Sequence, residues 1–310
     1  MRKAVIDVGS NSVLLVIAEH RDGAWRTLDE RTQVTALGDQ TKVTGLLSEA
    51  AMGRTLAALA EFFAVARATD APCIAGATMA ARIATNTPEF LARCAAQGTP
   101  VQVVSAQAEA QLGLFAVVDD PLFASAERVT IIDPGGHSTE ICTIDRVRGQ
   151  VELRKSVAVG ALGIRDEFAP GGVADGPTMM AMSATIDREI GMEYRPHTCG
   201  TVVTLGATGT NLVSIREKLT SWQPDRVHGQ ILDYEEVSKA AGWLGPMTDA
   251  ERAQVPGIEP GRERTLHIGA LILERFLWAC HGLDCAVSVR GWRYAALDHG
   301  LVLADELQRS

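Results

Sequence analysis

The sequence predicts an α/β protein built from two similar domains. The chain has 310 residues, about twice the length of a usual domain. A short motif, Asp-x-Gly-x-x-Ser, occurs twice, and predicted strands alternate with predicted helices after each copy. Because no low-complexity linker interrupts the chain, we expect domains over 1–125 and 126–310 that pack closely around a binding cleft.

The repeated motif is the most informative feature. Residues 4–17 read AVIDVGSNSVLLVI, and residues 130–144 read TIIDPGGHSTEICTI. Each copy is an apolar strand, a short turn rich in small residues and a second apolar strand, which is typical of a β-hairpin. An offset of 126 residues (133 − 7) indicates two related domains, since solenoid repeats recur at roughly 20–50 residues. Three pairs align: Asp7 with Asp133, Gly9 with Gly135, and Ser12 with Ser138.

The composition of the two turns favours anion binding. Glycine permits positive φ and lets an anion approach the backbone amides closely. A first loop at 9–12 and a second loop at 135–138, facing each other, would hold a chain of phosphates from both sides. The aspartate before each loop would then offer carboxylate oxygen to a hard divalent cation. The alternative is that Asp7 and Asp133 only begin Asx-turns, a common role of Asp before Gly.

A third loop, residues 206–210, follows a predicted strand at 201–205 and leads into a predicted helix. This order directs free amides and a helix dipole towards an anion. The loop lacks the Lys of a P-loop, so alone it is weak evidence.

The other elements of the first domain alternate between helix and strand. A long helix is expected over 48–69, with Ser48 as its N-cap. The elements expected after it are a buried strand at 72–77, a helix at 87–96, a strand at 101–104 and, after Ser105, a helix at 106–117.

The second domain is expected to follow the same scheme. Its hairpin strands reach about residue 158, and a helix covers 177–192. The later elements expected are the strand at 201–205, helices at 234–243 and 265–281, a strand at 286–291 and a last helix of about fourteen residues.

Composition and charge restrict the class of protein. Hydrophobic residues make up 46% and charged residues 22%, which predicts an ordered chain throughout. The 29 Lys and Arg against 38 Asp and Glu give a charge of −9, which argues against a nucleic-acid partner and requires a local positive cleft for any polyanion. No signal-like segment or apolar span of roughly 20 residues is present, so we expect a cytoplasmic protein with no membrane partner.

The six cysteines lie scattered in apolar segments without a CxxC pair. This is typical of free thiols in a reducing compartment. Cys280 and His281 with Cys285 resemble part of a metal site, but zinc sites usually draw on a second, closely spaced ligand pair.

Eight segments occur in a fixed order along the chain. They are VIDVGSNSVLLVI, ALGDQTKVTGLLSEAAMGRTLAAL, ATMAARIATNTPEFL, VVSAQAEAQLGLFAV, IDPGGHSTEI, TLGATGTNL, PGIEPGRERTLHIGALIL and SVRGWRYAAL. Taken in order, these segments resemble the exopolyphosphatase/guanosine pentaphosphate phosphatase (Ppx/GppA) family. The similarity covers nearly the whole chain, in the short form of the family. It implies two ribonuclease H-like domains of the actin-like ATPase, sugar kinase and heat-shock chaperone superfamily, with a Mg²⁺-dependent phosphatase site.

The resemblance also implies roles for individual residues. Glu109 corresponds to the catalytic glutamate, which orients or deprotonates the attacking water; without the family, a glutamate in a first helical turn is usually just solvated. Arg82 corresponds to an arginine whose guanidinium would bind phosphoryl oxygens. The metal, Mg²⁺ or alternatively Mn²⁺, would lie on Asp7, Asp133 and Glu140. The other phosphate-binding residues expected are Gly9, Ser10, Asn11, Ser12, Gly135, Gly136, His137, Ser138, Gly206, Thr208, Gly209 and Thr210.

The sequence departs from the family pattern at several positions. Glu109 is the one carboxylate left of a glutamate-rich stretch, and the arginine after that stretch is Gln111. Ala36 stands where arginine is frequent, and Arg264 replaces a frequent aspartate. The two missing arginines weaken the prediction of a long polyanion track.

The second loop departs most, because a family Gly-Gly-Gly-Ser reads Gly135-Gly136-His137-Ser138. A non-glycine residue at positive φ costs about 1–2 kcal/mol. The repeat places Asn11 opposite His137, and both residue types are enriched at positive φ, so the backbone of the loop is expected to be unchanged. His137 would then bind phosphate with a charge that varies near neutral pH, point away, or block the site.

These features together predict a hydrolase that releases terminal phosphate from polyphosphate, with short chains favoured. The alternatives are a phosphatase of guanosine pentaphosphate and a non-hydrolysing sensor that binds guanosine penta- or tetraphosphate. A kinase of the same superfamily is disfavoured because Glu109 lies on the phosphatase family's own helix. The resemblance adds a homodimer as a further expectation.

Overall fold

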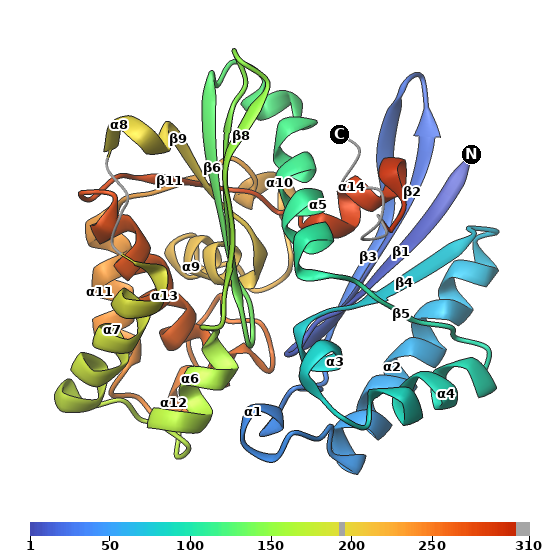
Figure 1. Cartoon of the computed structure of the whole chain (residues 1–310), viewed down its shortest axis with the longest axis horizontal. Coiled ribbons are helices and arrows are strands. Elements are labelled where there is room, and N and C mark those ends of the chain that lie inside the picture. The colour runs from blue at the N-terminus through green and yellow to red at the C-terminus, as the bar shows by residue number, and fades with distance from the viewer. Residues whose placement is uncertain (192–195, 302–310) are drawn as a thin grey trace. The chain divides into compact units, whose positions relative to one another are not determined.

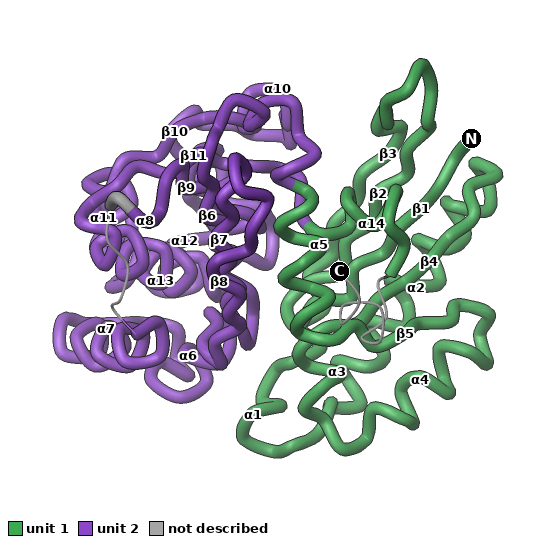
Figure 2. The backbone as a smooth tube through the Cα atoms, turned by 45° about the horizontal axis from the view of Figure 1, so that its top comes forward, with its two compact units in different colours: residues 1–116, 292–310 green, residues 117–291 purple. Residues whose placement is uncertain are grey.

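The computed structural model describes residues 1–191 and 196–301 of the chain. These form two compact units: residues 1–116 together with the C-terminal segment from Trp292, and residues 117–291 (Figure 2). The expected division at 125/126 lies a few residues after the observed one at 116/117. The C-terminal helix α14 (Trp292–His299) was expected in the second domain but belongs to the first unit. The physical reason is burial, since Trp292 and Leu297 pack in a core of the first unit.

The first unit contains a five-stranded mixed sheet in the order β3-β2-β1-β4-β5 (Figure 1). Its first three strands form an antiparallel meander, and the last two join in parallel. The strands are β1 (Arg2–Val8), β2 (Ser12–Arg21), β3 (Ala24–Val34), β4 (Cys73–Ala77) and β5 (Gln102–Val103).

Helices cover both faces of this sheet. Alternate residues of β1 point to opposite faces, so Ile6 packs in a core with Leu59 and Phe62 of α2 (Glu49–Ala68), whereas Val5 packs with α14. The Ser48 hydroxyl accepts a hydrogen bond from the Ala51 amide at 3.2 Å, which confirms the predicted N-cap. The remaining helices are α1 (Thr41–Thr44), α3 (Met79–Ile83), α4 (Thr87–Ala96) and α5 (Ala106–Val118).

The second unit repeats this topology. Its sheet has the order β10-β11-β9-β6-β7-β8, so the antiparallel meander β6-β7-β8 corresponds to β1-β2-β3, and β9 and β11 again join in parallel. The strands are β6 (Arg128–Pro134), β7 (Thr139–Asp145), β8 (Gln150–Val157), β9 (Thr201–Thr204), β10 (Ile231–Leu232) and β11 (Cys285–Val287).

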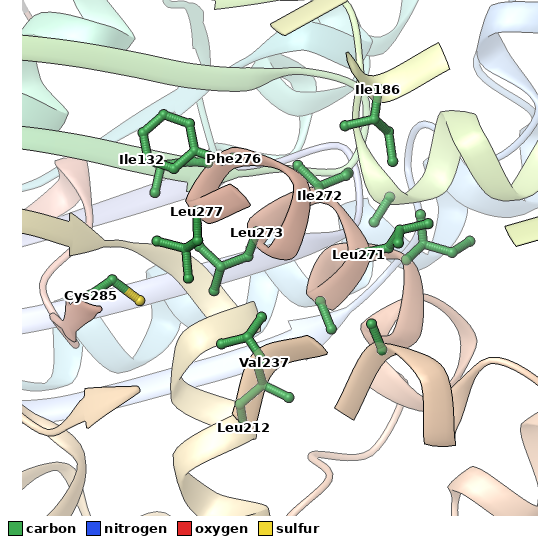
Figure 3. Close-up of a cluster of buried hydrophobic side chains, with 14 of the residues drawn as sticks. Ile132, Ile186, Leu212, Val237, Leu271, Ile272, Leu273, Phe276, Leu277 and Cys285 are labelled. Atoms are coloured by element: carbon green, nitrogen blue, oxygen red, sulfur yellow. The ribbon is translucent and has the colours of Figure 1, made fainter. Parts of the chain in front are cut away.

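The core of the second unit centres on helix α13 (Leu266–Ala279). Its side chains pack with Ile132 of the sheet and with residues of neighbouring helices such as Ile186, Leu212 and Val237 (Figure 3). Because α13 has neighbours on nearly every side, its sequence is apolar almost throughout. The other helices are α6 (Ala161–Phe168), α7 (Gly176–Ile190), α8 (Pro196–Cys199), α9 (Gly206–Arg216), α10 (Pro224–Val227), α11 (Tyr234–Leu244) and α12 (Asp249–Arg252), with 3₁₀ turns η1 (Pro121–Phe123) and η2 (Arg262–Arg264).

The predicted elements agree with these bounds to within a few residues. The helix predicted at 87–96 matches α4, and the strand predicted at 286–291 is shorter and begins at Cys285. The last helix was expected to have about fourteen residues, whereas α14 has eight. Most of the residues predicted to extend it lie outside the described ranges. No helix in the described ranges has the length and apolar character needed to cross a bilayer.

Candidate functional site

The first and second loops close with the same hydrogen bond. The Gly9 amide donates to the Ser12 carbonyl at 2.9 Å, and the Gly135 amide donates to the Ser138 carbonyl at 2.9 Å. A Cβ on Gly9 would lie 3.1 Å from the Ser12 carbonyl oxygen, and a Cβ on Gly135 would lie 2.9 Å from the Ser138 carbonyl oxygen. A side chain would therefore be crowded at Gly9 and would force a shift at Gly135, and the repeat seen in the sequence is a repeat of structure.

The expected strain at His137 is absent. Among the described residues, those with positive φ outside glycine include Ala36 at 48° but neither Asn11 nor His137. The prediction of positive φ at this loop position was therefore wrong, because the turn closes without a left-handed residue. The His137 side chain is fully buried, which favours the interpretation that it points away from a ligand.

The carbonyl groups of both loops are held by backbone amides of a later segment. In the first loop, the Ser10 carbonyl accepts from the Gly38 amide at 2.8 Å. In the second loop, the Gly136 carbonyl accepts from the Leu162 amide, at the start of α6, at 2.7 Å. A trans peptide directs its N–H opposite to its C=O, so the amides of Asn11 and His137 point away from these segments.

The second loop is packed tightly against the residue before α6. A Cβ on Gly160 would lie 2.5 Å from both the Gly136 carbonyl carbon and the His137 nitrogen. Only glycine permits this approach, so the start of α6 fixes the position of the loop.

Arg82 and Glu109 form a largely buried ion pair in the first unit. The Arg82 guanidinium donates to the Glu109 carboxylate at 2.7 Å and to the Val104 carbonyl at 2.9 Å. Their side chains are 15% and 13% exposed. Arg82 lies on α3, whose first turn is bound to the first loop because the Ser10 hydroxyl accepts from the Ala80 amide at 3.1 Å. The structure therefore connects the first loop to the predicted catalytic residue through one short helix.

The environment of Glu109 sets its charge. Glu109 lies in the first turn of α5, where the Ser105 hydroxyl accepts from the Ala108 amide at 3.1 Å. Burial raises the pKa of Glu109, while the charge and hydrogen bond of Arg82 act in the opposite direction. Burial is the larger effect, so the pKa of Glu109 is raised overall, and Arg82 limits the rise and favours the ionised carboxylate that a general base requires.

The two repeated aspartates have different neighbours. In the first hairpin Asp7 lies opposite Leu14, whereas in the second hairpin Asp133 lies opposite Glu140. Directly opposed residues of an antiparallel pair place their side chains on the same face, with Cβ atoms about 4.5–5.5 Å apart. A pair of facing carboxylates therefore exists in the second copy of the motif and not in the first.

This carboxylate pair suits a divalent cation. Glu140 is buried and accepts a hydrogen bond from the Ser156 hydroxyl at 2.8 Å, which orients it. Like charges placed directly opposite each other destabilise a sheet unless a cation or a proton compensates them. Mg²⁺ is usually bound through one or two carboxylates, with water and substrate phosphates completing its coordination. Across the described residues, no group of three or more His, Cys, Asp or Glu side chains is arranged to hold a metal.

Asp7 instead lies near a cation of the first unit. Burial lowers the pKa of Arg293, but the charges of Tyr294, Glu30 and Asp7 outweigh it and the pKa is raised. Arg293 also donates to the Glu30 carboxylate at 2.9 Å. Neither Arg293 nor Ser156 was predicted as a site residue. Ser156 meets Glu140 through the pairing of β7 with β8, and Arg293 comes near Asp7 because the C-terminal helix returns to the first unit.

Residues 206–210, predicted as a third loop, instead form the first turns of helix α9 (Gly206–Arg216), because the chain turns directly from β9 into the helix at Leu205. We keep the name third loop for these residues, which start beside Asp133. Gly206 has φ of 75°, and a Cβ there would lie 2.6 Å from a carboxylate oxygen of Asp133. The Asp133 carboxylate thus lies at the start of α9, where the helix dipole favours negative charge.

The other residues of the third loop have structural contacts. A Cβ on Gly209 would lie 2.6 Å from the Thr204 side chain, and Thr208 packs against Gly269 of α13. The Thr210 hydroxyl donates back to the Ala207 carbonyl at 3.2 Å. Phosphate binding by the backbone of this loop stays a prediction.

The sequence of this chain is similar to that of known phosphatases along most of its length. A sequence model of the Ppx/GppA phosphatase family matches residues 16–306. The chain belongs to this family. The predictions of the family and of a phosphatase-family enzyme are confirmed.

Similar proteins cover nearly the full chain. Exopolyphosphatase 2 of Mycobacterium tuberculosis is 27% identical over 293 residues, which are 88% of this chain and 89% of that protein. Exopolyphosphatase 1 of Mycobacterium bovis is 27% identical over 316 residues, which are 98% of this chain and 88% of that protein. The crystal structure of a Ppx/GppA family member from Aquifex aeolicus is 28% identical with a TM-score of 0.77, and 96% of each chain is covered. The predicted actin-like fold is therefore confirmed.

Proposed function

We propose that the protein is an exopolyphosphatase-type hydrolase that releases terminal phosphate from inorganic polyphosphate by attack of water. The observation that carries this proposal is the largely buried Arg82–Glu109 pair, bound through α3 to the first loop. A largely buried carboxylate whose pKa is raised by burial, beside a cation that limits the rise, has the properties of a general base. Membership of a phosphatase family supports this use of it.

Glu109 would orient the attacking water and accept its proton, and this role needs the carboxylate unprotonated. Arg82 would act mainly through Glu109, because its guanidinium already donates to that carboxylate and to the Val104 carbonyl. In this proposal Arg82 is a positioning residue, and direct binding of phosphoryl oxygens by Arg82 is the alternative. No covalent nucleophile is needed, since positioning and charge stabilisation account for most of phosphoryl transfer.

We further propose that Asp133 and Glu140 hold Mg²⁺, with Mn²⁺ as a substitute. Their opposed position in β6 and β7 supports this assignment, whereas Asp7 of the first unit faces Leu14 and is the weaker candidate ligand. A bound divalent cation would neutralise the charge that develops on phosphate oxygens. The amides of the first and second loops would orient the nonbridging oxygens.

Guanosine pentaphosphate is the second candidate substrate. Ala36 and Gln111 replace two arginines of the family pattern, which removes cations that a long polyanion track would use. This substitution favours short or nucleotide-linked anhydrides.

Substitution of the candidate base tests the proposal. Phosphate release from short polyphosphate and from guanosine pentaphosphate would be measured with Mg²⁺ for the wild type, Glu109→Gln and Glu89→Gln. We expect Glu109→Gln to lower kcat by about 10²- to 10⁴-fold with little change in KM. Glu89 is the matched control, because it also lies in a first helical turn beside an arginine but is exposed.

Two outcomes would contradict the proposal. Equal activity of the wild type and Glu109→Gln would remove Glu109 from catalysis. Tight nucleotide binding by the wild type with no phosphate release from either substrate would identify a sensor rather than an enzyme.

A further inference from the structure

Two cysteines of the second unit face each other in its core. The sulfur atoms of Cys199 and Cys280 lie 3.1 Å apart, and both residues are fully buried. Cys199 ends α8, and Cys280 directly follows α13, so the pair joins segments 81 residues apart in the sequence. Neither residue belongs to the site proposed above.

The backbone around Cys199 is held firmly to the sheet. The Thr130 hydroxyl donates to the Cys199 carbonyl at 2.6 Å. The Arg128 guanidinium donates to the neighbouring Thr198 carbonyl at 3.2 Å. These bonds hold the backbone of Thr198 and Cys199 to β6, the strand that carries Arg128 and Thr130.

The two cysteines also adjoin β9 and α13, the two elements that contact the third loop. β9 begins two residues after Cys199 and leads directly into this loop. α13 contacts the loop near its start, because Gly269 packs against the Thr208 hydroxyl, and it carries Cys280 at its end. A bond between the sulfurs would tie both elements together at the end remote from the loop.

The thiols of the pair differ in acidity. The pKa of Cys199 is lowered, first by its hydrogen bond with the Cys280 thiol and further by Thr198 and the charge of Arg128, which together outweigh the opposing effect of burial. Burial instead raises the pKa of Cys94 to about 12 and that of Cys142 to about 11. Of these three thiols, Cys199 is thus the one best able to form a reactive thiolate.

We propose that Cys199 and Cys280 are a redox-active pair that closes to a disulfide with a peroxide-class oxidant and reopens with a thiol reductant. The Cys199 thiolate attacks one oxygen of the peroxide, the O–O bond breaks, and the leaving hydroxide takes a proton to become water. The Cys280 sulfur then attacks the resulting sulfenic acid, and the S–S bond forms as the S–O bond breaks. The second hydroxide leaves with the Cys280 proton as a second water, so two thiols are oxidised and one peroxide is reduced.

The geometry requires little movement for this step. A disulfide bond is about 2.04 Å long, so sulfurs now 3.1 Å apart must approach by about 1 Å. Hydrogen peroxide is small enough to reach a buried thiol through local fluctuations of the core, whereas large thiol reagents are not. The closed bond would restrict the unfolded chain across the intervening segment and so raise the unfolding temperature.

The test maps cysteine pairing in the full chain. The folded protein would be treated with hydrogen peroxide, its remaining thiols alkylated after denaturation, and its peptides analysed without reduction by mass spectrometry. We expect a linked Cys199–Cys280 peptide that lacks two hydrogen atoms and separates on reduction with dithiothreitol. We also expect a higher unfolding temperature for the oxidised protein, reversed by the same reductant.

Variants distinguish this pair from general oxidation. Cys280→Ser, which keeps a hydroxyl group beside Cys199, should abolish the linked peptide and leave Cys199 as a sulfenic acid, detected by the added oxygen mass of its peptide. Cys285→Ala, which removes a buried cysteine close in sequence, should leave the link intact.

Three results would overturn the proposal. The first is oxidation of the partly exposed Cys73 in the wild type while Cys199 and Cys280 stay as thiols. The second is a link from Cys280 to Cys285 in place of Cys199. The third is a Cys199–Cys280 link that dithiothreitol does not reopen. Mapping the wild type gives each of these results, so the test does not depend on the folding of any variant.

Discussion

At the scale of single residues, equivalent positions of the repeat carry different chemistry. Asp7 and Asp133 occupy the same place in two hairpins with the same closing hydrogen bond. Leu14 faces the first and Glu140 faces the second, so only the second copy concentrates negative charge on one face. A cation that bridges two carboxylates would therefore bind the second copy.

Removal of one of these carboxylates should weaken metal binding without unfolding the protein. We expect Glu140→Gln to unfold at the same or a higher temperature without metal, because the opposed charges are gone and the amide oxygen can still accept from Ser156. For the wild type, Mg²⁺ at a hundredfold excess over Kd should add about 2.7 kcal/mol, and most of this gain should disappear in the variant. Thermal unfolding across a series of Mg²⁺ and Mn²⁺ concentrations measures both effects.

The control for this prediction is Glu167→Gln, since Glu167 is an exposed glutamate of the same unit. An unchanged response of Glu140→Gln to Mg²⁺ would exclude Glu140 as a ligand.

The Arg82–Glu109 pair predicts a change in the pH profile. Burial raises the pKa of Glu109 and Arg82 opposes this, so Arg82→Gln should raise that pKa further. Activity needs the carboxylate and falls as the pH drops through its pKa, so the acidic limb of kcat/KM should move to higher pH. Arg82→Lys keeps the charge and should move the limb less.

The same measurement distinguishes positioning from phosphate binding. If Arg82 only binds phosphoryl oxygens, Arg82→Gln should raise KM and leave the acidic limb where it is in the wild type.

At the scale of elements, the loops are held by the helices and segments that follow them. The start of α6 packs on the second loop at Gly160, and α9 begins against the carboxylate of Asp133 at Gly206. Glycine at these two contacts allows backbone and carboxylate to approach more closely than a side chain would permit. The predicted site therefore depends on short, crowded contacts within one unit.

Substitution of Gly206 should disturb both stability and the candidate metal site. In Gly206→Ala the alanine would have to keep the positive φ of this position, at a cost of about 1–2 kcal/mol. Its Cβ would also press on the Asp133 carboxylate. We expect a loss of at least about 1 kcal/mol in the free energy of unfolding, together with weaker Mg²⁺ stabilisation. Gly171→Ala is the matched control, since nothing lies within 4 Å of its Cβ position. Equal stability of the two variants would show that the contact at Gly206 relaxes without cost.

At the scale of the whole molecule, the chain passes from the first unit to the second and returns. The returning helix α14 completes the core of the first unit, where Trp292 packs on Gly76 of β4 and Arg293 binds Glu30. The stability of the first unit therefore depends on residues that follow the second unit in the sequence.

Trp292→Ala should destabilise the first unit selectively. Loss of a buried tryptophan costs about 3–5 kcal/mol, and the affected core includes Val5 and Val16 of the central strands. Hydrogen exchange should show faster exchange in β1 and β4 and little change in β6 and β9. Trp243→Ala, which changes an exposed tryptophan of α11, should leave both sheets protected. Equal loss of protection in both units would contradict the division described here.

The sequence by itself determined the duplicated hairpins, the alternation of strands and helices, the Ser48 cap and the family. These follow from local rules, because side-chain periodicity and turn sterics act over a few residues. It did not determine the φ of His137, which the closing hydrogen bond of the turn decides. The glycines of the third loop were predicted as phosphate contacts, whereas Gly209 makes room for the packing of α9 on the sheet.

Only the tertiary structure decided which distant residues meet. Arg82 reaches Glu109 across 27 residues, and Cys199 meets Cys280 across 81. The C-terminal helix joins the first unit because the apolar face of that sheet offers it burial. Such contacts depend on the packing of whole elements, which no local pattern in the sequence encodes, and they set the ionisation of Glu109 and the pairing of the two thiols.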